Sequence, residues 1–69
     1  MTNFNELPEI LTAVQISKYL QLTPSTVYAL FKKKPEYGGI PNFDIGNSKR
    51  VEKKDFIQWI QARKNEKAS

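Results

Sequence analysis

Hydrophobic residues recur at helical spacing over two short stretches in the first half of the chain. Ile16 and Leu20 stand at i and i+4 in the first stretch, and Val27, Leu30 and Phe31 follow the i, i+3, i+4 pattern in the second. Only a few residues separate the two stretches. The pattern therefore predicts two amphipathic helices joined by a tight turn.

Capping residues indicate where both helices begin. Thr12, with Gln15 three positions later, forms a capping-box pattern, in which each side chain accepts a hydrogen bond from the backbone N–H of the other residue. Thr23 followed by Pro24 places a hydroxyl acceptor at the N-cap and a preset φ at the first helical position. The second helix is therefore predicted to begin at Pro24.

The second helix carries a different stripe on its outer face. Ser25, Tyr28, Ala29 and Lys32 follow the i, i+3, i+4, i+7 spacing and supply two hydroxyls, a methyl and an ammonium group. In a DNA groove a hydroxyl bonds base edges or phosphates, a methyl meets the thymine methyl, and a cation meets phosphate or guanine. Such a stripe is typical of a helix that enters the major groove.

The pattern after the second helix predicts a loop and, nearer the end of the chain, a third helix. Residues 33–41, KKPEYGGIP, contain two prolines and a Gly-Gly pair, which predicts a loop in which Tyr37 is either an anchor or a phosphate contact. Residues 52–64 begin with acidic and end with basic side chains, as the helix dipole favours. The predicted core residues of this third helix are Phe56, Ile57, Trp59 and Ile60.

Between the loop and the third helix, alternation over residues 42–51 predicts a β-hairpin with two possible registers. One has a two-residue Gly-Asn turn and pairs Phe43 with Arg50. The other has a three-residue Gly-Asn-Ser loop and pairs Phe43 with Val51. We favour the second, because it gathers the apolar residues on one face. It pairs Ile45 with Lys49, places Phe43, Ile45 and Val51 on the core face, and leaves Asp44 and Arg50 outward.

Composition narrows the chemistry that the chain can perform. With 69 residues, it allows one small domain with a modest core. It contains no cysteine and no histidine, which excludes thiol nucleophiles, disulfides, finger-type zinc sites and imidazole acid–base catalysis. No combination of a nucleophile with a base, and no phosphate-cradling glycine loop, is evident. We therefore expect no cofactor, no metal and no enzymatic activity.

The net charge of +4 is distributed unevenly along the chain. Residues 32–54 contain seven basic and three acidic side chains, whereas residues 1–31 have a slight acidic excess. A basic excess that begins where the second helix ends suggests a continuous surface facing a polyanion. A solvated basic face without a partner is the alternative interpretation.

The order helix, turn, helix, loop, hairpin, helix describes a winged helix-turn-helix, a mainly α fold with a small β-hairpin. The residues resemble the excisionase family of small DNA-binding proteins, which is related to the winged heads of MerR-type regulators. The resemblance covers residues 11–60. Its most specific pieces are LT at residues 11–12, YLQLTPSTVYAL at 19–30, FDIGNSKRV at 43–51 and DFIQWI at 55–60.

The resemblance implies that the second helix enters the major groove and that the wing reaches the adjacent backbone or minor groove. Members commonly carry an arginine at the position of Arg50, which implies a wing contact here. Two departures stand out. Gln21 replaces a frequent glycine and bears strain if that position needs a positive φ. Pro24 and Ala29 replace frequent arginines, so specificity rests on hydroxyls, DNA shape or several copies side by side.

These observations define a set of candidate DNA-binding residues. It comprises Thr23, Pro24, Ser25, Thr26, Tyr28, Ala29, Lys32, Lys33, Lys49 and Arg50. Hydroxyls in a first helical turn also bond the backbone, so helix-start chemistry is the alternative for Ser25 and Thr26. Lys34 is interpreted as a solvated charge, and Trp59 as a core residue rather than a platform for a nucleobase.

The domain organisation follows from the same pattern. We expect a flexible arm at residues 1–9, the DNA-binding domain at residues 10–64 and a flexible tail at residues 65–69. No apolar run approaches the roughly 20 residues that span a bilayer, and the first ten residues lack signal-peptide blocks. We expect a cytoplasmic protein of a bacterium or phage, without membrane contact, that joins the nucleoid when bound to DNA.

The resulting hypothesis is an excisionase that binds and bends double-stranded DNA and directs integrase-mediated excision of a mobile element. Its expected partners are DNA, an integrase, and further copies of the chain that bind cooperatively. A transcriptional or replication regulator using the same surface is the alternative. A protein-interaction adaptor whose basic face is incidental is a third hypothesis, and it predicts binding that salt does not weaken.

Overall fold

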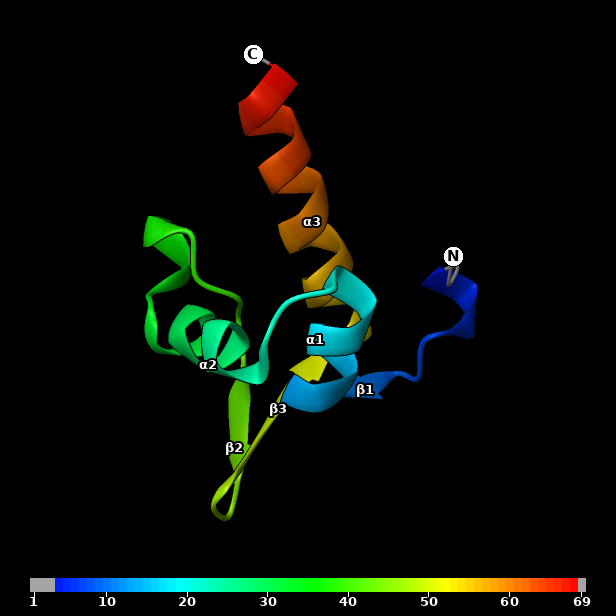
Figure 1. The fold of residues 1–69 in the computed structure, drawn as a ribbon, viewed down its shortest axis with the longest axis vertical. Helices are drawn as coiled ribbons and strands as arrows, with labels where there is room; N and C mark the ends of the chain where they lie inside the picture. Colours follow the sequence, from blue (N-terminus) through cyan, green and yellow to red (C-terminus); the bar gives the residue numbers. More distant parts are fainter. Residues whose placement is uncertain (1–3, 69) are drawn as a thin grey trace.

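The structure is a computed structural model that describes residues 4–68 (Figure 1). Its helices are α1 (Ala13–Leu20), α2 (Pro24–Lys32) and α3 (Lys53–Ala68), with short 3-10 turns η1 (Phe4–Glu6) and η2 (Pro35–Tyr37). Its strands are β1 (Ile10–Leu11), β2 (Phe43–Ile45) and β3 (Ser48–Glu52). In Figure 1, α1 and α2 lie beside one end of α3, and the β2–β3 hairpin projects away from the helices as a wing. The predicted winged helix-turn-helix is confirmed.

Both predicted helix starts are confirmed by their caps. The Thr12 hydroxyl accepts from the Gln15 N–H at 3.1 Å, and the Gln15 side-chain oxygen accepts from the Thr12 N–H at 2.9 Å. At α2, the Thr23 hydroxyl accepts from the Thr26 N–H at 3.3 Å, and Pro24 is the first helical residue. These bonds satisfy donors that a helix start otherwise leaves without partners.

The turn between α1 and α2 depends on a left-handed residue. Gln21 adopts φ 59° and ψ 43°, and its N–H donates to the carbonyl of Lys18 at 3.3 Å. The next residue, Leu22, donates to the carbonyl of Ser17 at 2.9 Å. The positive φ considered for Gln21 is therefore present. Residues with a Cβ adopt this backbone conformation only at a cost in free energy.

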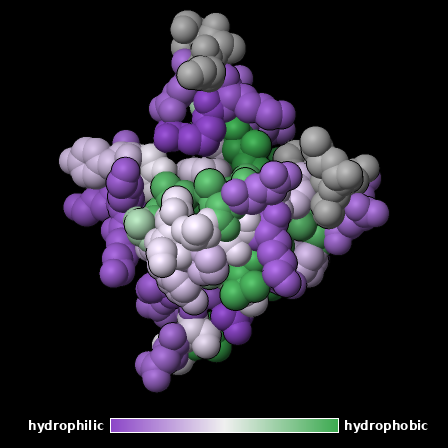
Figure 2. Space-filling view, viewed as in Figure 1, coloured by the Kyte–Doolittle hydropathy of each residue, from purple (hydrophilic) through white to green (hydrophobic). Residues whose placement is uncertain are grey.

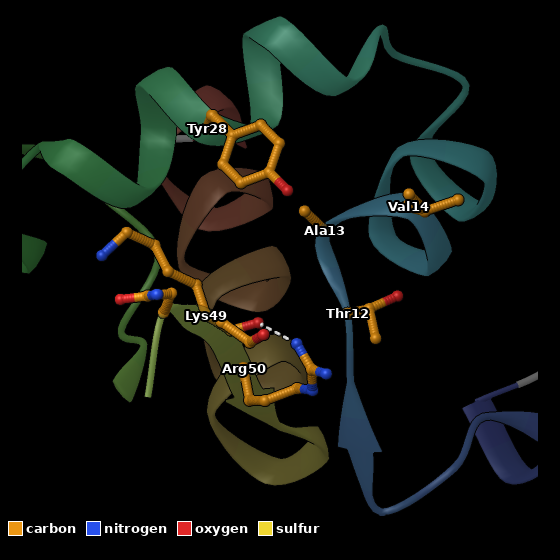
Figure 3. Close-up of a pocket in the computed structure, with 8 residues that line it drawn as sticks. Thr12, Ala13, Val14, Tyr28, Lys49 and Arg50 are labelled. Carbon is orange, nitrogen blue, oxygen red and sulfur yellow. Dashed lines mark hydrogen bonds between the residues drawn. The ribbon is translucent and has the colours of Figure 1, made fainter. Parts of the chain in front are cut away.

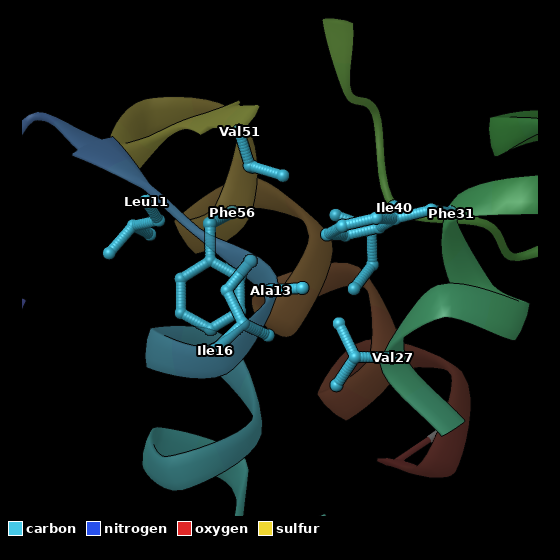
Figure 4. Close-up of a cluster of buried hydrophobic side chains, with 8 residues drawn as sticks. All are labelled: Leu11, Ala13, Ile16, Val27, Phe31, Ile40, Val51 and Phe56. Atoms are coloured by element: carbon cyan, nitrogen blue, oxygen red, sulfur yellow. The ribbon is translucent and has the colours of Figure 1, made fainter. Parts of the chain in front are cut away.

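The core gathers side chains from every helix, from β1 and β3, and from the loop before β2 (Figure 4). Its buried hydrophobic members are Leu11, Ala13, Ile16, Val27, Phe31, Ile40, Val51 and Phe56. The ring of Tyr19 meets Phe56 edge-on, with centroids 5.7 Å apart. The helical stripes of α1 and α2 thus face the core as their spacing predicts. Among residues 4–68, no helix is long and apolar enough to cross a membrane.

The loop after α2 is tied to the body by polar contacts. The Asn42 side-chain amide donates to the carbonyls of Phe31 and Ile40, at 3.0 and 2.8 Å. The Trp59 indole donates to the carbonyl of Gly38 at 3.0 Å, and its ring packs against the core. The structural role expected for Trp59 is therefore confirmed. Tyr37 is 75% exposed, so it does not anchor the loop by burial.

The sheet has a third strand that the sequence did not indicate. β3 lies between β1 and β2, and both pairings are antiparallel. In the β1–β3 pair, Leu11 lies opposite Val51, and both side chains are fully buried. The backbone N–H of Lys53 donates to the carbonyl of Glu9 at 2.8 Å just beyond this pair. These contacts fix the base of the wing against the start of α1.

The hairpin register favoured from the sequence is wrong. Phe43 pairs with Arg50, and Ile45 pairs with Ser48, so the connection is the two-residue turn. Gly46 has φ 61° and Asn47 does not have a positive φ, which matches the φ pattern of a type II′ turn, a type that suits the twist of a hairpin.

The side-chain orientations expected on β2 change with this register. Phe43 and Ile45 are 38% and 60% exposed, instead of facing the core. The hydrophobic alternation misleads because β2 is an edge strand that projects beyond the core, so no buried face imposes the register (Figure 1). Val51, on the central strand, is buried as predicted.

α2 ends at Lys32, directly before the loop predicted from residue 33, and Lys34 precedes η2. The bounds of the third helix differ from the sequence prediction. α3 begins at Lys53 and continues through Ala68, well beyond the predicted end at residue 64. Within the expected N-terminal arm, η1 occupies Phe4–Glu6, and residues 1–3 lie outside the described residues, as does residue 69 of the expected tail.

Candidate nucleic-acid interface

The outer face of α2 is exposed along its length. Ser25, Ala29 and Lys32 are exposed, and Tyr28 is 46% exposed. In Figure 2 the surface over α2 is pale, as expected for weakly polar hydroxyl-bearing residues, whereas strongly hydrophilic side chains cover the far end of α3. The predicted stripe therefore presents hydroxyls, a methyl and one cation to solvent.

Tyr28 is oriented by its neighbours. Its ring meets Phe31 edge-on, with centroids 5.9 Å apart and an angle of 83° between the rings. In Figure 3 its hydroxyl points from α2 toward Ala13, at the start of α1. Tyr28 thus leans from the stripe toward the space between the helices and the wing.

That space is a groove of about 390 Å³ between α2, the start of α1 and the wing (Figure 3). Its lining residues are Thr12, Ala13, Val14, Tyr28, Asn47, Ser48, Lys49 and Arg50. It brings together Tyr28, Lys49 and Arg50, which belong to distant parts of the sequence. The other candidate residues lie outside the groove, on α2 and at its ends.

The two cations of the wing are held differently. The Lys49 ammonium donates to the Asp44 carboxylate across the hairpin at 2.9 Å, so its charge is balanced locally. Arg50 is half-buried, and its guanidinium donates to the carbonyl of Lys49 at 2.9 Å. One such bond engages a neutral acceptor and leaves most of the five guanidinium N–H donors for a ligand. Arg50 is therefore the stronger anion-binding group of the wing.

The remaining candidates divide between helix-start chemistry and open surface. The Thr23 and Thr26 hydroxyls lie 2.9 Å apart and share a hydrogen bond, which favours the structural interpretation of Thr26. Pro24 is exposed at the first helical position. Lys33 is exposed directly after the last residue of α2.

Sequence reasoning missed several residues of the groove. Ala13 and Val14 form its wall at the first turn of α1, and Thr12, Asn47 and Ser48 add polar groups. The first turn of α1 meets the wing because β1 pairs with β3, and no pattern of residues predicts that pairing. The Gly-Asn pair at the wing tip is a recognised two-residue turn signal, and it could have placed Asn47 and Ser48.

Comparison with known proteins adds one finding. Residues 10–64 match the family described as helix-turn-helix domain. Among curated proteins and among solved structures, nothing matches the chain. The matched range begins at β1 and includes α1, α2, the wing and most of α3. The match therefore covers every element that lines the groove.

Proposed function

The chain belongs to the helix-turn-helix domain family, which indicates a DNA-binding protein, and we propose that it is an excisionase. In this role it binds and bends double-stranded DNA and directs an integrase toward excision of the mobile element that encodes it. It contributes no catalytic residue of its own. The observation that carries DNA contact is the groove, where Tyr28 of α2 and Arg50 of the wing converge beside the exposed face of α2.

The composition of the α2 face supports an architectural role. It offers hydroxyls, a methyl and Lys32, and it has no arginine. A bidentate arginine–guanine contact supplies about 1–3 kcal/mol of discrimination between bases, and this helix lacks it. Several copies on adjacent sites restore specificity, because each adds its own modest contribution. The same assembly bends the DNA that an integrase must bring together.

Binding and excision test this proposal together. We expect stepwise complexes in mobility-shift assays on duplexes that cover the ends of the encoding element. In cells that carry the element and its integrase, Arg50→Ala and Tyr28→Ala should lower excision strongly. Lys64→Ala removes the same charge as the Arg50 variant from an exposed position on α3, and excision should persist. Undiminished excision in the Arg50 and Tyr28 variants contradicts the proposal.

The salt dependence of binding separates this proposal from an adaptor that binds only protein. A surface that neutralises Z phosphates gives log K against log salt a slope of about −0.9Z, whereas an adaptor shows no DNA affinity. A regulator of transcription would bind DNA with the same salt dependence. It would change expression from nearby promoters in a reporter assay and leave excision unaffected.

A further inference from the structure

The groove between α2 and the wing has walls of two kinds. Hydrogen-bond donors come from Tyr28, Ser48 and Arg50, and apolar surface comes from Ala13 and Val14. Val14 is 49% exposed although it is aliphatic. No acidic side chain lines the groove within residues 4–68. Donors beside apolar surface, without carboxylates, suit a ligand that carries both anionic oxygens and a hydrocarbon ring.

The Tyr28 hydroxyl is directed into this groove rather than along the outer face of α2 (Figure 3). Its ring is held by the edge-on contact with Phe31. In the part of the chain that the structure describes, no group bonds the Tyr28 hydroxyl. A positioned phenol without a partner is a donor prepared for a ligand.

DNA geometry indicates which part of the duplex meets this groove. The major groove is about 12 Å wide and admits a helix, and the minor groove beside it is about 6 Å wide. One sugar–phosphate strand separates the two. When α2 occupies the major groove and the wing reaches the adjacent minor groove, that strand must pass between α2 and the wing. The 390 Å³ groove occupies this position.

We propose that the groove binds this sugar–phosphate strand, with the Tyr28 hydroxyl and the Arg50 guanidinium donating to phosphate oxygens and Val14 contacting a deoxyribose. The inference rests on the proposed DNA binding and adds a role for each residue. Tyr28 then contacts the backbone and carries no sequence information, while Ser25, Ala29 and Lys32 remain the residues of α2 that face the bases. Phosphate contacts of this kind fix the register of a protein on DNA.

The first test combines Tyr28→Phe with chemical substitution of single phosphates. The probe is a duplex selected by the protein from a random pool, scanned with one methylphosphonate at a time, and a scrambled duplex serves as reference. We expect Tyr28→Phe to weaken binding to both duplexes by a similar factor of about ten, as for a hydrogen bond to a charged group. At one phosphate, the methylphosphonate should weaken DNA binding by the wild type and have little further effect on the affinity of Tyr28→Phe.

The second test places a charge in the groove. Val14 is the second residue of α1, where the helix dipole stabilises a carboxylate, so the Val14→Glu variant should fold. Repulsion of a phosphate should weaken its DNA binding by a factor of about ten or more, and rising salt should reduce this loss. Val14→Gln introduces a side chain of the same size without the charge, and it should lose much less DNA affinity than Val14→Glu. Gln61→Glu adds the charge at an exposed position on α3 and should bind like the wild type.

The outcomes distinguish this inference from the proposed function. If Tyr28→Phe weakens only the selected duplex, or remains fully sensitive to every methylphosphonate, Tyr28 reads a base and the inference is wrong, while DNA binding stands. Equal affinities of Val14→Glu and Val14→Gln also overturn the inference. If the wild type binds neither duplex at any salt concentration, the proposed function fails, and the inference fails with it.

Discussion

The side-chain amide of Asn42 donates to the carbonyl of Phe31, in the last turn of α2, at 3.0 Å. The same amide donates to the carbonyl of Ile40 at 2.8 Å. A helix end leaves carbonyls without intrahelical partners, and here a side chain from the following loop satisfies one of them. Asn42 thus connects the end of α2 to the start of the wing.

We expect Asn42→Ala to lower the free energy of unfolding by about 1–2 kcal/mol, because two partly buried carbonyls lose a donor. Urea denaturation followed by the fluorescence of Trp59 measures the change. Asn65→Ala makes the same substitution at an exposed position of α3 and should leave the midpoint unchanged or slightly raised, since alanine favours helices. An Asn42→Ala midpoint equal to that of the wild type would mean that water replaces the amide without cost.

Gly39 is required for steric reasons at the same helix end. A Cβ at this position would lie 2.0 Å from the carbonyl oxygen of Lys33 and 2.9 Å from that of Leu30. We expect Gly39→Ala to destabilise the domain by about 2 kcal/mol or more, because the backbone must move.

Gly46 provides the matched control for this prediction. A Cβ there meets nothing within 4 Å, although φ is +61°. Gly46→Ala should therefore cost only the penalty of about 1–2 kcal/mol that a residue with a Cβ pays at positive φ. Thermal unfolding of the two variants compares them directly. Gly39 does not have a positive φ, so a loss no larger than that of Gly46→Ala would show that the backbone moves away from the added Cβ at little cost.

The turn residue Gln21 offers a stabilising substitution. Glycine removes the penalty of about 1–2 kcal/mol that a Cβ pays at φ 59°, and the greater freedom of glycine in the unfolded chain offsets part of the gain. We expect Gln21→Gly to raise the free energy of unfolding by about 0.5 kcal/mol. Gln61→Gly, in the interior of α3, should instead lower it by about 1 kcal/mol. A loss at both positions contradicts the strain assigned to Gln21.

Local chemistry explains what the sequence predicts well. The capping box at Thr12 and Gln15, and the start of α2 at Pro24, each depend on residues within one helical turn. The buried stripe of α2 is predicted from the helical spacing of its apolar residues alone. These features can be predicted from residues close together in the sequence, and all of them are confirmed.

The features that the sequence predicts poorly depend on contacts between distant segments. The wing register was inferred from the apolar side chains of Phe43 and Ile45, but an edge strand beyond the core gives them no buried face. The turn geometry at Gly46 decides the register instead. The groove escapes sequence reasoning for a related reason, since Val14 reaches the wing only through the pairing of β1 with β3.

The Asp44–Lys49 contact leads to a prediction about DNA affinity. Asp44 neutralises Lys49 at 2.9 Å and places a carboxylate on the wing, where it repels phosphates. We expect Asp44→Asn to tighten DNA binding severalfold, because Lys49 is then free to contact a phosphate. The slope of log K against log salt should steepen by about 0.9, as for one additional neutralised phosphate. Filter binding or fluorescence anisotropy over a range of salt concentrations measures both quantities.

Three further variants test the cause of this gain. Lys49→Ala leaves Asp44 unbalanced and should weaken binding, and the double variant Asp44→Asn/Lys49→Ala should recover part of that loss. Arg50→Ala should reduce the slope by about 1, because Arg50 has no carboxylate partner among residues 4–68. Exposed ion pairs contribute about 0–1 kcal/mol to stability, so the unfolding midpoint of Asp44→Asn should change little. Weaker binding by Asp44→Asn would show that the pair orders the wing for DNA, instead of masking its charge.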